Sequence, residues 1–465
     1  MPEPITLSRR HLLCTTSAGF GYLAFAGLSS FAAELSTASS QNPLTAKAPH
    51  FAAKAKRVIF LCMVGAPSHV DTFDYKPDLN RDHGKKGRYG GQLLGSQWKF
   101  RQRGENGLWI SDLFPSVASH ADDLCLIRSM HCDQPVHPAA QTQMHTGTAQ
   151  FVRPSLGAWT LYGLGTENDS VPGFVSLAPP PGASRNYGSA FLPAIYGGTS
   201  VGRAARGGVG GMQAAPSTAS VADIHNPRIT KTQQRTQLDL IQSLNQNKLE
   251  RDEYHPEVEG VIESYELAFR MQDAMPNLMD TSGETAETLA MYGADRGATA
   301  SFGRQCLMAR RFIEAGVRFV EVTQGGWDHH RNLSEDLPES CNQIDKPIAG
   351  LLQDLKARDM LKDTLVVWGG EFGRTPAAQG GDGRDHNNKG YTTWMAGGGV
   401  KGGLSYGATD EYGYEAVDHK CHIHDWHATI LHALGLDHQR LTYRYAGRDF
   451  RLTDVHGNVQ TEIFA

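Results

Sequence analysis

The sequence has no marked excess of charge of either sign, and its main part has no long apolar run. Across its 465 residues, 44 Lys and Arg face 49 Asp and Glu, which gives a formal net charge of −5. Without a basic excess, the chain lacks the electrostatic signature of nucleic-acid binding. After about the first 30 residues, no apolar run approaches the roughly 18 residues that a membrane-spanning helix needs. We therefore expect no nucleic-acid partner and no membrane span in the mature chain.

Several motifs of familiar enzyme classes are also missing. The chain has no His-Glu-x-x-His pair and no Gly-x-x-x-x-Gly-Lys-Ser/Thr loop, which argues against zinc proteases and P-loop enzymes. A Gly-x-Ser-x-Gly match at 198–202 lies in a Pro- and Gly-rich stretch, away from any strand-to-helix turn. A Gly-x-Gly-x-x-Gly match at 397–402 is not followed by a helical pattern, so dinucleotide binding is not expected.

Cysteine is scarce, and no two cysteines have Cys-x-x-Cys spacing. Of the seven, Cys14 lies near the N-terminus outside any lipobox context. Cys62, Cys125 and Cys306 lie in apolar strand-like or helix-like patterns, which are typical of buried free thiols. An exported protein can also form disulfides, and the sequence leaves open which cysteines would pair.

Residues 1–33 have the order of a signal peptide. Arg9 and Arg10 precede a mildly apolar stretch, and small residues follow at Ala32 and Ala33. The run at 8–13 is similar to the twin-arginine consensus, and the weak apolar stretch favours that export route over an ordinary Sec signal. We expect a periplasmic or extracellular protein with a linker at 34–50 and one folded domain at 51–465.

Continuous apolar runs alternate with helical patterns along the main part of the chain. The runs predict buried strands at 57–64, 124–128, 318–322 and 364–368. Helical spacing is clear at 302–313 and 348–355, and Asp425 is predicted to N-cap a helix that runs to His432. This order predicts an α/β fold, doubly wound, with a mostly parallel sheet and helices on both faces. Residues from about 155 to 300 are predicted to form a loop- and helix-rich insertion.

Carboxylates and imidazoles follow each of the four predicted strands. Ligands in open α/β sheets bind at the carboxyl ends of strands, so we expect these side chains to meet. The candidate metal ligands are His69, Asp71, Asp328, His330, Glu371 and His386. This donor set suits Zn²⁺, Mn²⁺, Mg²⁺ or Ca²⁺, and one or two such ions could assist displacement at phosphorus or sulfur. An arginine could clamp the oxyanion, the candidates being Arg128, Arg374 and Arg384.

Each candidate also has a structural interpretation. Asp71 could cap a helix, His69 could be a loop histidine, and His386 could lie in a turn. Glu371 follows a very apolar strand and needs a partner there, either Arg374 or a metal ion. Three further histidines lie near a helix start and are expected to be structural or exposed: His422, His424 and His427.

Long stretches of the chain resemble the exported bacterial proteins of domain-of-unknown-function family 1501. The stretches are GAPSHVDTFD at 65–74, GGWDHH at 325–330, LVVWGGEFGRTP at 365–376, GRDHN at 383–387, MAGGGVKGG at 395–403 and GRDFRL at 447–452. The similarity runs from about residue 55 to the C-terminus. Members are commonly described as sulfatase-like and belong to the alkaline-phosphatase-like superfamily. The resemblance therefore implies an alkaline-phosphatase-like fold with a metal-dependent hydrolase or mutase core.

The C-terminal half follows the superfamily pattern in order. Asp328 and His330 stand where its Asp and first His fall, although with a shorter spacing. Glu371 and Phe372 stand at its Asp-His pair, and His386 stands at its later His.

The N-terminal half departs from that pattern. The first strand ends in Gly65 instead of Asp, so His69 or Asp71 must substitute if metal binds there. The nucleophile position, about ten residues before the Thr-Gly motif that ends at Gly147, is occupied by His137. This histidine could be a nucleophile, a metal ligand or neither. The Cys-x-Pro-x-Arg motif that matures to formylglycine is missing.

The function expected from these features is an exported metal-dependent hydrolase of sulfate or phosphate esters. Its substrate would be a small-molecule or polysaccharide ester, with His137 as nucleophile or ligand and Arg374 binding the oxyanion. The alternative is a catalytically inactive binding or scaffold protein on the same fold, and a third option is phosphoryl or sulfuryl transfer. The sequence does not determine the ester, the metal or the oligomeric state.

Overall fold

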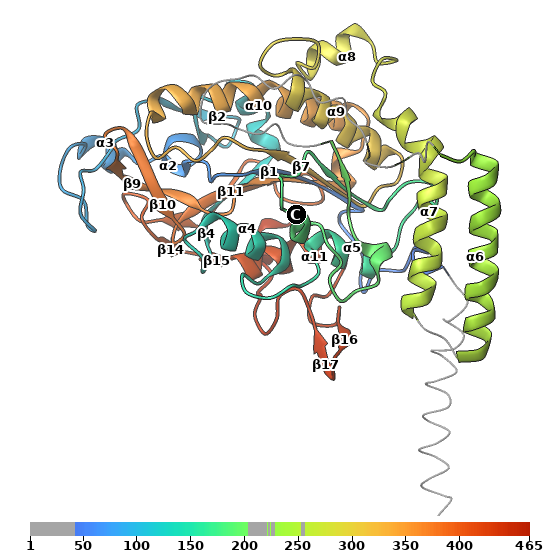
Figure 1. Cartoon of the computed structure of the whole chain (residues 1–465). Helices are drawn as coiled ribbons and strands as arrows, with labels where there is room; N and C mark the ends of the chain where they lie inside the picture. The colour runs from blue at the N-terminus through green and yellow to red at the C-terminus, as the bar shows by residue number, and fades with distance from the viewer. Residues whose placement is uncertain (1–41, 203–220, 222–223, 225–227, 253–255) are drawn as a thin grey trace, which may run out of the picture.

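A computed structural model describes residues 42–202, 221, 224, 228–252 and 256–465 of the chain (Figure 1). The predicted signal peptide lies outside these residues, as do 34–41 of the predicted linker and 203–220 of the predicted insertion. Within the described part of the chain, no helix has the length and apolar character needed to cross a membrane.

The core of the molecule is a sheet of nine strands. Their order is β12-β4-β11-β8-β1-β7-β5-β6, with β15 also paired to β4. Strand β11 runs antiparallel to both of its neighbours, whereas every other pairing in this sheet is parallel. The expectation of a mostly parallel sheet is therefore confirmed. The strands are β1 (Arg57–Met63), β4 (Leu124–His131), β5 (Phe174–Leu177), β6 (Thr199–Val201), β7 (Phe319–Gln324), β8 (Thr364–Gly369), β11 (Tyr391–Ala396), β12 (Leu404–Tyr406) and β15 (Cys421–His422).

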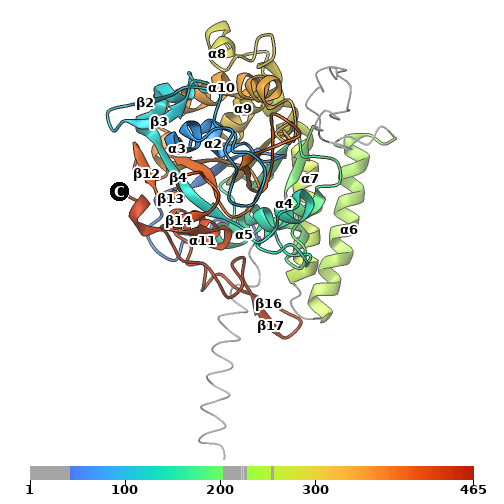
Figure 2. The same cartoon turned by 90° about the vertical axis from the view of Figure 1, so that its left-hand side faces the viewer.

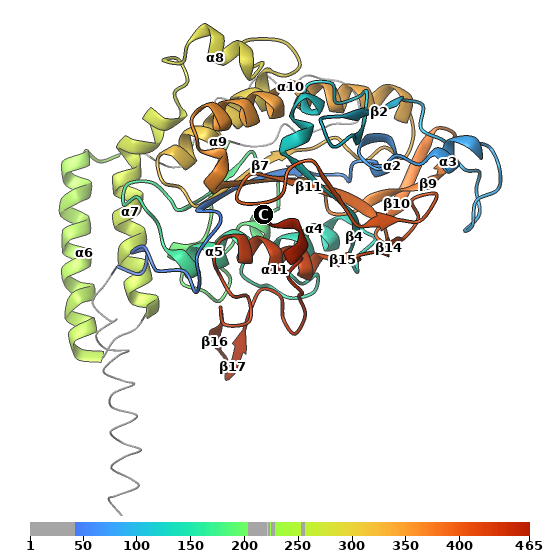
Figure 3. The same ribbon diagram turned by 180° about the vertical axis from the view of Figure 1, so that it is seen from behind.

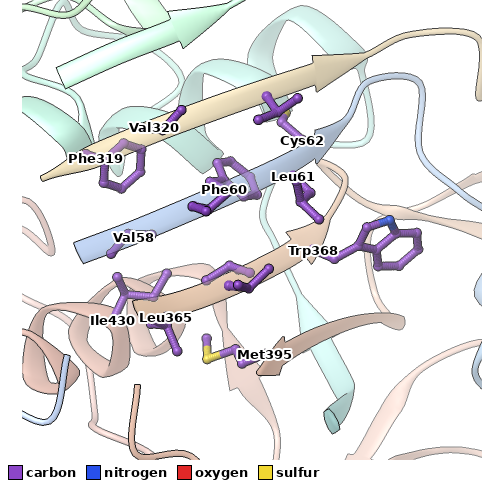
Figure 4. Packing of buried hydrophobic residues seen from close by; sticks show 14 of the residues in the cluster. Val58, Phe60, Leu61, Cys62, Phe319, Val320, Leu365, Trp368, Met395 and Ile430 are labelled. Carbon is purple, nitrogen blue, oxygen red and sulfur yellow. The ribbon is translucent and has the colours of Figure 1, made fainter. Parts of the chain in front are cut away.

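The central strands are buried on both faces, as their unbroken apolar sequences predict. Figure 4 shows β7, β1 and β8 running in the same direction, with Phe60 and Leu61 on opposite faces of β1. All six residues of β8 are buried, as are all but the first residue of β1. This rigid centre fixes where each strand ends and therefore where the following loop begins.

Helices cover both faces of the sheet (Figures 1 and 2). One face carries α9 (Ala300–Glu314) and α10 (Leu333–Ala357), and the other carries α4 (His137–Thr146), α5 (Leu156–Leu164) and α11 (Ile423–Ala433). The doubly wound arrangement is thus confirmed.

The start of α11 corrects one prediction. Its N-cap is His422 and not Asp425, because the His422 side chain accepts from the His424 backbone N–H. Asp425 lies at the third helical position and accepts from the His422 backbone N–H at 2.9 Å, which completes a capping box.

Smaller elements lie around this core. The hairpin of β9 (Gly373–Gln379) and β10 (Gly383–Asn387) lies at the same end of the molecule as α2 (His69–Thr72) and α3 (Pro77–Arg81). Residues 155–300 include β5 and β6, which extend the main sheet, and the long helices α6 (Lys231–Asp252) and α7 (Pro256–Met279), which stand together at its edge (Figure 3). The remaining elements are β2 (Phe100–Arg103), β3 (Leu108–Ser111), α8 (Ala286–Met291), β13 (Ala408–Thr409), β14 (Ala416–Asp418), β16 (Tyr443–Tyr445) and β17 (Arg448–Phe450).

Candidate metal centre

Three imidazoles and one carboxylate converge at the carboxyl end of the sheet. His137 opens α4 shortly after β4 ends, and Asp328 and His330 lie in the loop after β7. His386 lies on β10 of the hairpin that follows β8. One donor atom from each of these side chains lies within 4.8 Å of the donor atoms of the other three.

The Oδ1 atom of Asp328 is the common neighbour of the three rings. It lies 3.1 Å from Nε2 of His137, 2.9 Å from Nε2 of His330 and 3.6 Å from Nε2 of His386. The Nε2 atoms of His330 and His386 are 2.9 Å apart. Four donors placed tetrahedrally around a zinc ion, at about 2.0–2.1 Å each, would be roughly 3.3–3.4 Å apart. The four observed separations range from 2.9 to 3.6 Å around this value, which is compatible with donors that share one ion.

The outer nitrogen of each ring is held by an acceptor. Nδ1 of His137 lies 2.6 Å from Oε1 of Glu371, and Nδ1 of His386 lies 2.7 Å from the Pro135 carbonyl oxygen. Nδ1 of His330 lies 2.5 Å from Oε1 of Gln379. In the neutral rings these contacts place the proton on Nδ1 and leave the Nε2 lone pair facing the cluster, as in metal-bound histidines. The Nε2 atoms of His330 and His386 are then 2.9 Å apart, a separation that either a shared proton or a metal ion between them would stabilise.

Glu371 lies behind His137 and not among the converging donor atoms. Its buried carboxylate accepts from the Gln141 amide at 3.2 Å and from the Gly65 backbone N–H at 3.1 Å, in addition to the His137 ring. Burial disfavours a charged His137, but the hydrogen bonds to Asp328 and Glu371 outweigh burial and raise the pKa of His137 to about 9 when no metal is present.

Arg374 is buried beneath Asp328, and its side chain is only 1% exposed. The guanidinium donates to Oδ1 of Asp328 at 2.5 Å and to backbone carbonyls, including those of Gly65 and Ala66. Burial alone would raise the pKa of the Asp328 carboxyl, but hydrogen bonds from His137 and Arg374 hold that pKa well below its usual range. The carboxylate is therefore ionised and fixed in position.

His69 and Asp71 are not brought together with the other predicted ligands. Asp71 forms a fully buried ion pair with Arg384, with Nε to Oδ2 at 2.7 Å and Nη2 to Oδ1 at 3.1 Å. His69 contacts the Gly413 carbonyl through Nε2 at 2.9 Å. Arg128 donates to Asp74 at 3.4 Å.

The loop after β7 separates its two adjacent histidines. His330 joins the cluster, whereas His329 is buried and its Nε2 lies 3.4 Å from the Ser340 hydroxyl on α10. Burial lowers the pKa of His329 to about 4, so this ring is neutral in the folded protein. Successive side chains of this loop therefore lie on opposite sides, and Asp328 and His330, which are two residues apart, both lie on the cluster side.

Sequence reasoning did not identify the groups that support the ligands. Gln379, Gln141 and the Pro135 carbonyl belong to this supporting layer. Of these groups, only Gln141 could have been identified from the sequence, because it lies four residues after His137 and therefore on the same face of the helix. Nothing in the sequence separates Gln379 from the other glutamines.

Comparisons with solved structures give remote likenesses. A sulfatase from Pseudoalteromonas sp. is 12% identical, covers 89% of this chain and 72% of its own, and has a TM-score of 0.37. Alkaline phosphatase from the Antarctic bacterium TAB5 is 12% identical, with 76% and 93% coverage and a TM-score of 0.30. A lipoteichoic acid synthase from Listeria monocytogenes is 9% identical, with 88% and 78% coverage and a TM-score of 0.33. A comparison with curated proteins found no match.

A family match covers nearly all of the described chain. It extends over residues 55–464 and includes every residue of the cluster and of its supporting layer. The matching family is described as "Protein of unknown function (DUF1501)". The chain belongs to this family, as the motifs after its strands predict.

Proposed function

We propose that the chain is a metal-dependent hydrolase of sulfate or phosphate esters, in which His137, Asp328, His330 and His386 bind one divalent ion. The observation that carries this proposal is the convergence of three Nε2 atoms on Asp328 while each Nδ1 atom is held by an acceptor. Three imidazoles and one carboxylate favour Zn²⁺ over the harder ions Mg²⁺ and Ca²⁺. Such an ion acts as a Lewis acid toward a phosphoryl or sulfuryl oxygen.

The chain's own residues would position this chemistry. The Asp328 side chain is 50% exposed, so the cluster is open to an ester from solvent. Arg374 would fix Asp328, because its buried guanidinium is used by that carboxylate and by backbone carbonyls. We therefore propose a positioning role for Arg374 in place of oxyanion binding. Glu371 would orient His137 in the same way.

His137 is proposed as a ligand and not as a nucleophile. Its Nδ1 is bound to Glu371, and its Nε2 faces Asp328 and shares the cluster with two further imidazoles. A nucleophilic histidine needs a free nitrogen lone pair aimed at the substrate, and a ligand does not have one. In this scheme water is the attacking group.

A binding or scaffold protein on the same fold is the second candidate. The observation that favours it is the imidazole of His137 at the position where the resemblance expects a Ser, Thr or Cys nucleophile. Metal would still bind at the cluster, and the ion would hold an anionic ligand without cleaving it.

One experiment separates these candidates. Purified protein is assayed for bound metal by elemental mass spectrometry and for turnover of a panel of sulfate and phosphate monoesters, beside His330→Ala. A hydrolase holds about one equivalent of metal more than His330→Ala does, and it turns over an ester that the variant does not. The same difference in metal content with turnover at background in both proteins favours the binding candidate. Equal metal content in the two proteins would contradict the proposed ligand set.

Export by the twin-arginine route is part of the proposal, and it rests on the basic pair and weak apolar stretch near the N-terminus. A small-molecule or polysaccharide ester outside the cytoplasm would then be the substrate. Replacing both Arg9 and Arg10 by Lys should leave the full-length precursor in the cytoplasmic fraction. Unchanged export of that variant would instead indicate an ordinary Sec signal.

A further inference from the structure

A second group of metal-ligating side chains lies inside the core, apart from the cluster described above. It consists of Cys62 on β1, Glu321 on β7 and His145 on α4, with donor atoms within 4.8 Å of one another. All three residues are at least 95% buried. Glu321 pairs in register with Phe60, so Glu321 and Cys62 lie on the same face of the sheet, and Figure 4 shows Cys62 near the end of β1.

The three side chains are aimed at one another and have few other hydrogen-bond partners. Nδ1 of His145 contacts the Gln141 carbonyl oxygen at 2.7 Å, which places a proton on Nδ1. Nε2 of His145 then faces Oε2 of Glu321 at 3.2 Å and Sγ of Cys62 at 4.0 Å. Among the residues that the structure describes, no donor reaches Oε2 of Glu321 with hydrogen-bond geometry.

A buried carboxylate oxygen without a hydrogen-bond donor is costly, and the ion-pair partner of Oε2 of Glu321 is the His145 ring, 3.2 Å away. A divalent ion between the three side chains would bind this oxygen in place of that contact and would bind the Cys62 sulfur and the His145 nitrogen as well. Its two positive charges would balance the Glu321 carboxylate and the Cys62 thiolate, so the filled site would be neutral in the core. The thiol proton, and any proton on Nε2 of His145, would leave to solvent as the bonds from the metal to sulfur and nitrogen form.

We infer that Cys62, His145 and Glu321 form a second, buried site for a borderline or soft divalent ion, of which Zn²⁺ is the natural occupant. In tetrahedral zinc geometry the nitrogen–oxygen separation is about 3.3 Å and the nitrogen–sulfur separation about 3.6 Å. The observed 3.2 Å and 4.0 Å lie close to these values. A thiolate and an imidazole exclude Mg²⁺ and Ca²⁺ as preferred ions.

The position of the site gives it a structural role. It would join β1, β7 and α4, and α4 also carries His137 of the first cluster at its start. Because its ligands are buried, the ion must enter while the chain folds and should exchange slowly afterwards. The first cluster is open to solvent, so a chelator should distinguish the two sites.

The test uses full-length protein produced in cobalt-supplemented medium and then dialysed against EDTA in the native state. The wild type should retain about one equivalent of cobalt and show a near-ultraviolet thiolate-to-cobalt charge-transfer band. Cys62→Ser should lose both the band and the retained cobalt. His330→Ala should keep both, which makes the result independent of the first cluster.

Cys306→Ser is the matched control, because Cys306 is also a fully buried thiol but belongs to neither cluster. It should keep the band and the cobalt. If Cys62→Ser does not fold, as judged by circular dichroism, His145→Gln takes its place and should lose the band. A folded wild type without the band, or a band that survives the substitution of Cys62 or His145, would overturn the inference.

Discussion

Nδ1 of His137 lies 2.6 Å from Oε1 of Glu371, a fully buried carboxylate on the opposite side of the ring from Asp328. The ring is therefore held from behind while its second nitrogen faces the cluster. Carboxylates placed in this way orient a histidine ligand and raise its basicity.

Glu371→Gln should therefore weaken metal binding without removing any ligand. We expect a loss of about 10- to 100-fold in zinc affinity, the usual effect of losing such a partner. Competition with a chromophoric chelator measures this change. The control is Glu411→Gln, because Glu411 is exposed and lies away from the cluster residues in the sequence. This variant should bind zinc like the wild type. Complete loss of zinc in Glu371→Gln would instead make Glu371 a ligand, as the sequence predicts.

Two aspartates of the same region give a second prediction. Oδ1 of Asp328 meets all three rings, whereas Asp385 is exposed and lies 3.9 Å from Nδ1 of His330. A metal present at 100 times its dissociation constant stabilises the folded chain by about 2.7 kcal/mol. Thermal unfolding should show this gain for the wild type and for Asp385→Asn but not for Asp328→Asn. The same gain in all three proteins would remove Asp328 from the site.

The sequence predicts the fold well because the central strands are buried on both faces. Runs such as the one at 57–64 have no competing helical period, and their ends locate the loops where Asp328 and Glu371 lie. The strand-end rule also brings Asp328, His330 and His386 to one edge, and the structure places these three together.

The partners of each side chain could not be predicted in the same way. Asp71 and Arg384 are 313 residues apart in the chain, and no local pattern indicates that they pair. Glu371 and His137 both follow predicted strands in the sequence, so which one faces the cluster depends on how the start of α4 lies against the loop after β8. The N-cap of α11 was misplaced by three residues because a histidine took a position that Asp more often occupies.

The Asp71–Arg384 pair is expected to contribute to stability and not to metal binding. Both side chains are completely buried, so Asp71→Asn leaves an uncompensated guanidinium in the core. Such a loss costs about 3–5 kcal/mol, which urea unfolding should detect while zinc content stays unchanged. Asp78→Asn breaks an exposed ion pair with Arg81 and should change little. Zinc loss at unchanged stability would show instead that Asp71 is a ligand.

His427 gives the last prediction, which concerns the pH dependence of stability. The ring is fully buried, and Nε2 donates to the Met144 carbonyl oxygen at 2.6 Å. Burial lowers the pKa of His427 to about 3, whereas an unfolded chain has a histidine pKa of about 6.5. Between these values only the unfolded state binds the proton. Stability is thus fully present above about pH 6.5 and falls toward about pH 3, by up to 1.4 kcal/mol per pH unit.

His427→Gln retains a donor for the Met144 carbonyl and cannot take up a proton in this range. The free energy of unfolding, measured by urea titration at about pH 7 and about pH 5, should therefore fall less steeply for the variant than for the wild type. The other buried histidines titrate in both proteins, so their contribution cancels in the difference between the two slopes. Parallel slopes would mean that His427 is protonated in the folded state, which its burial and its single acceptor argue against.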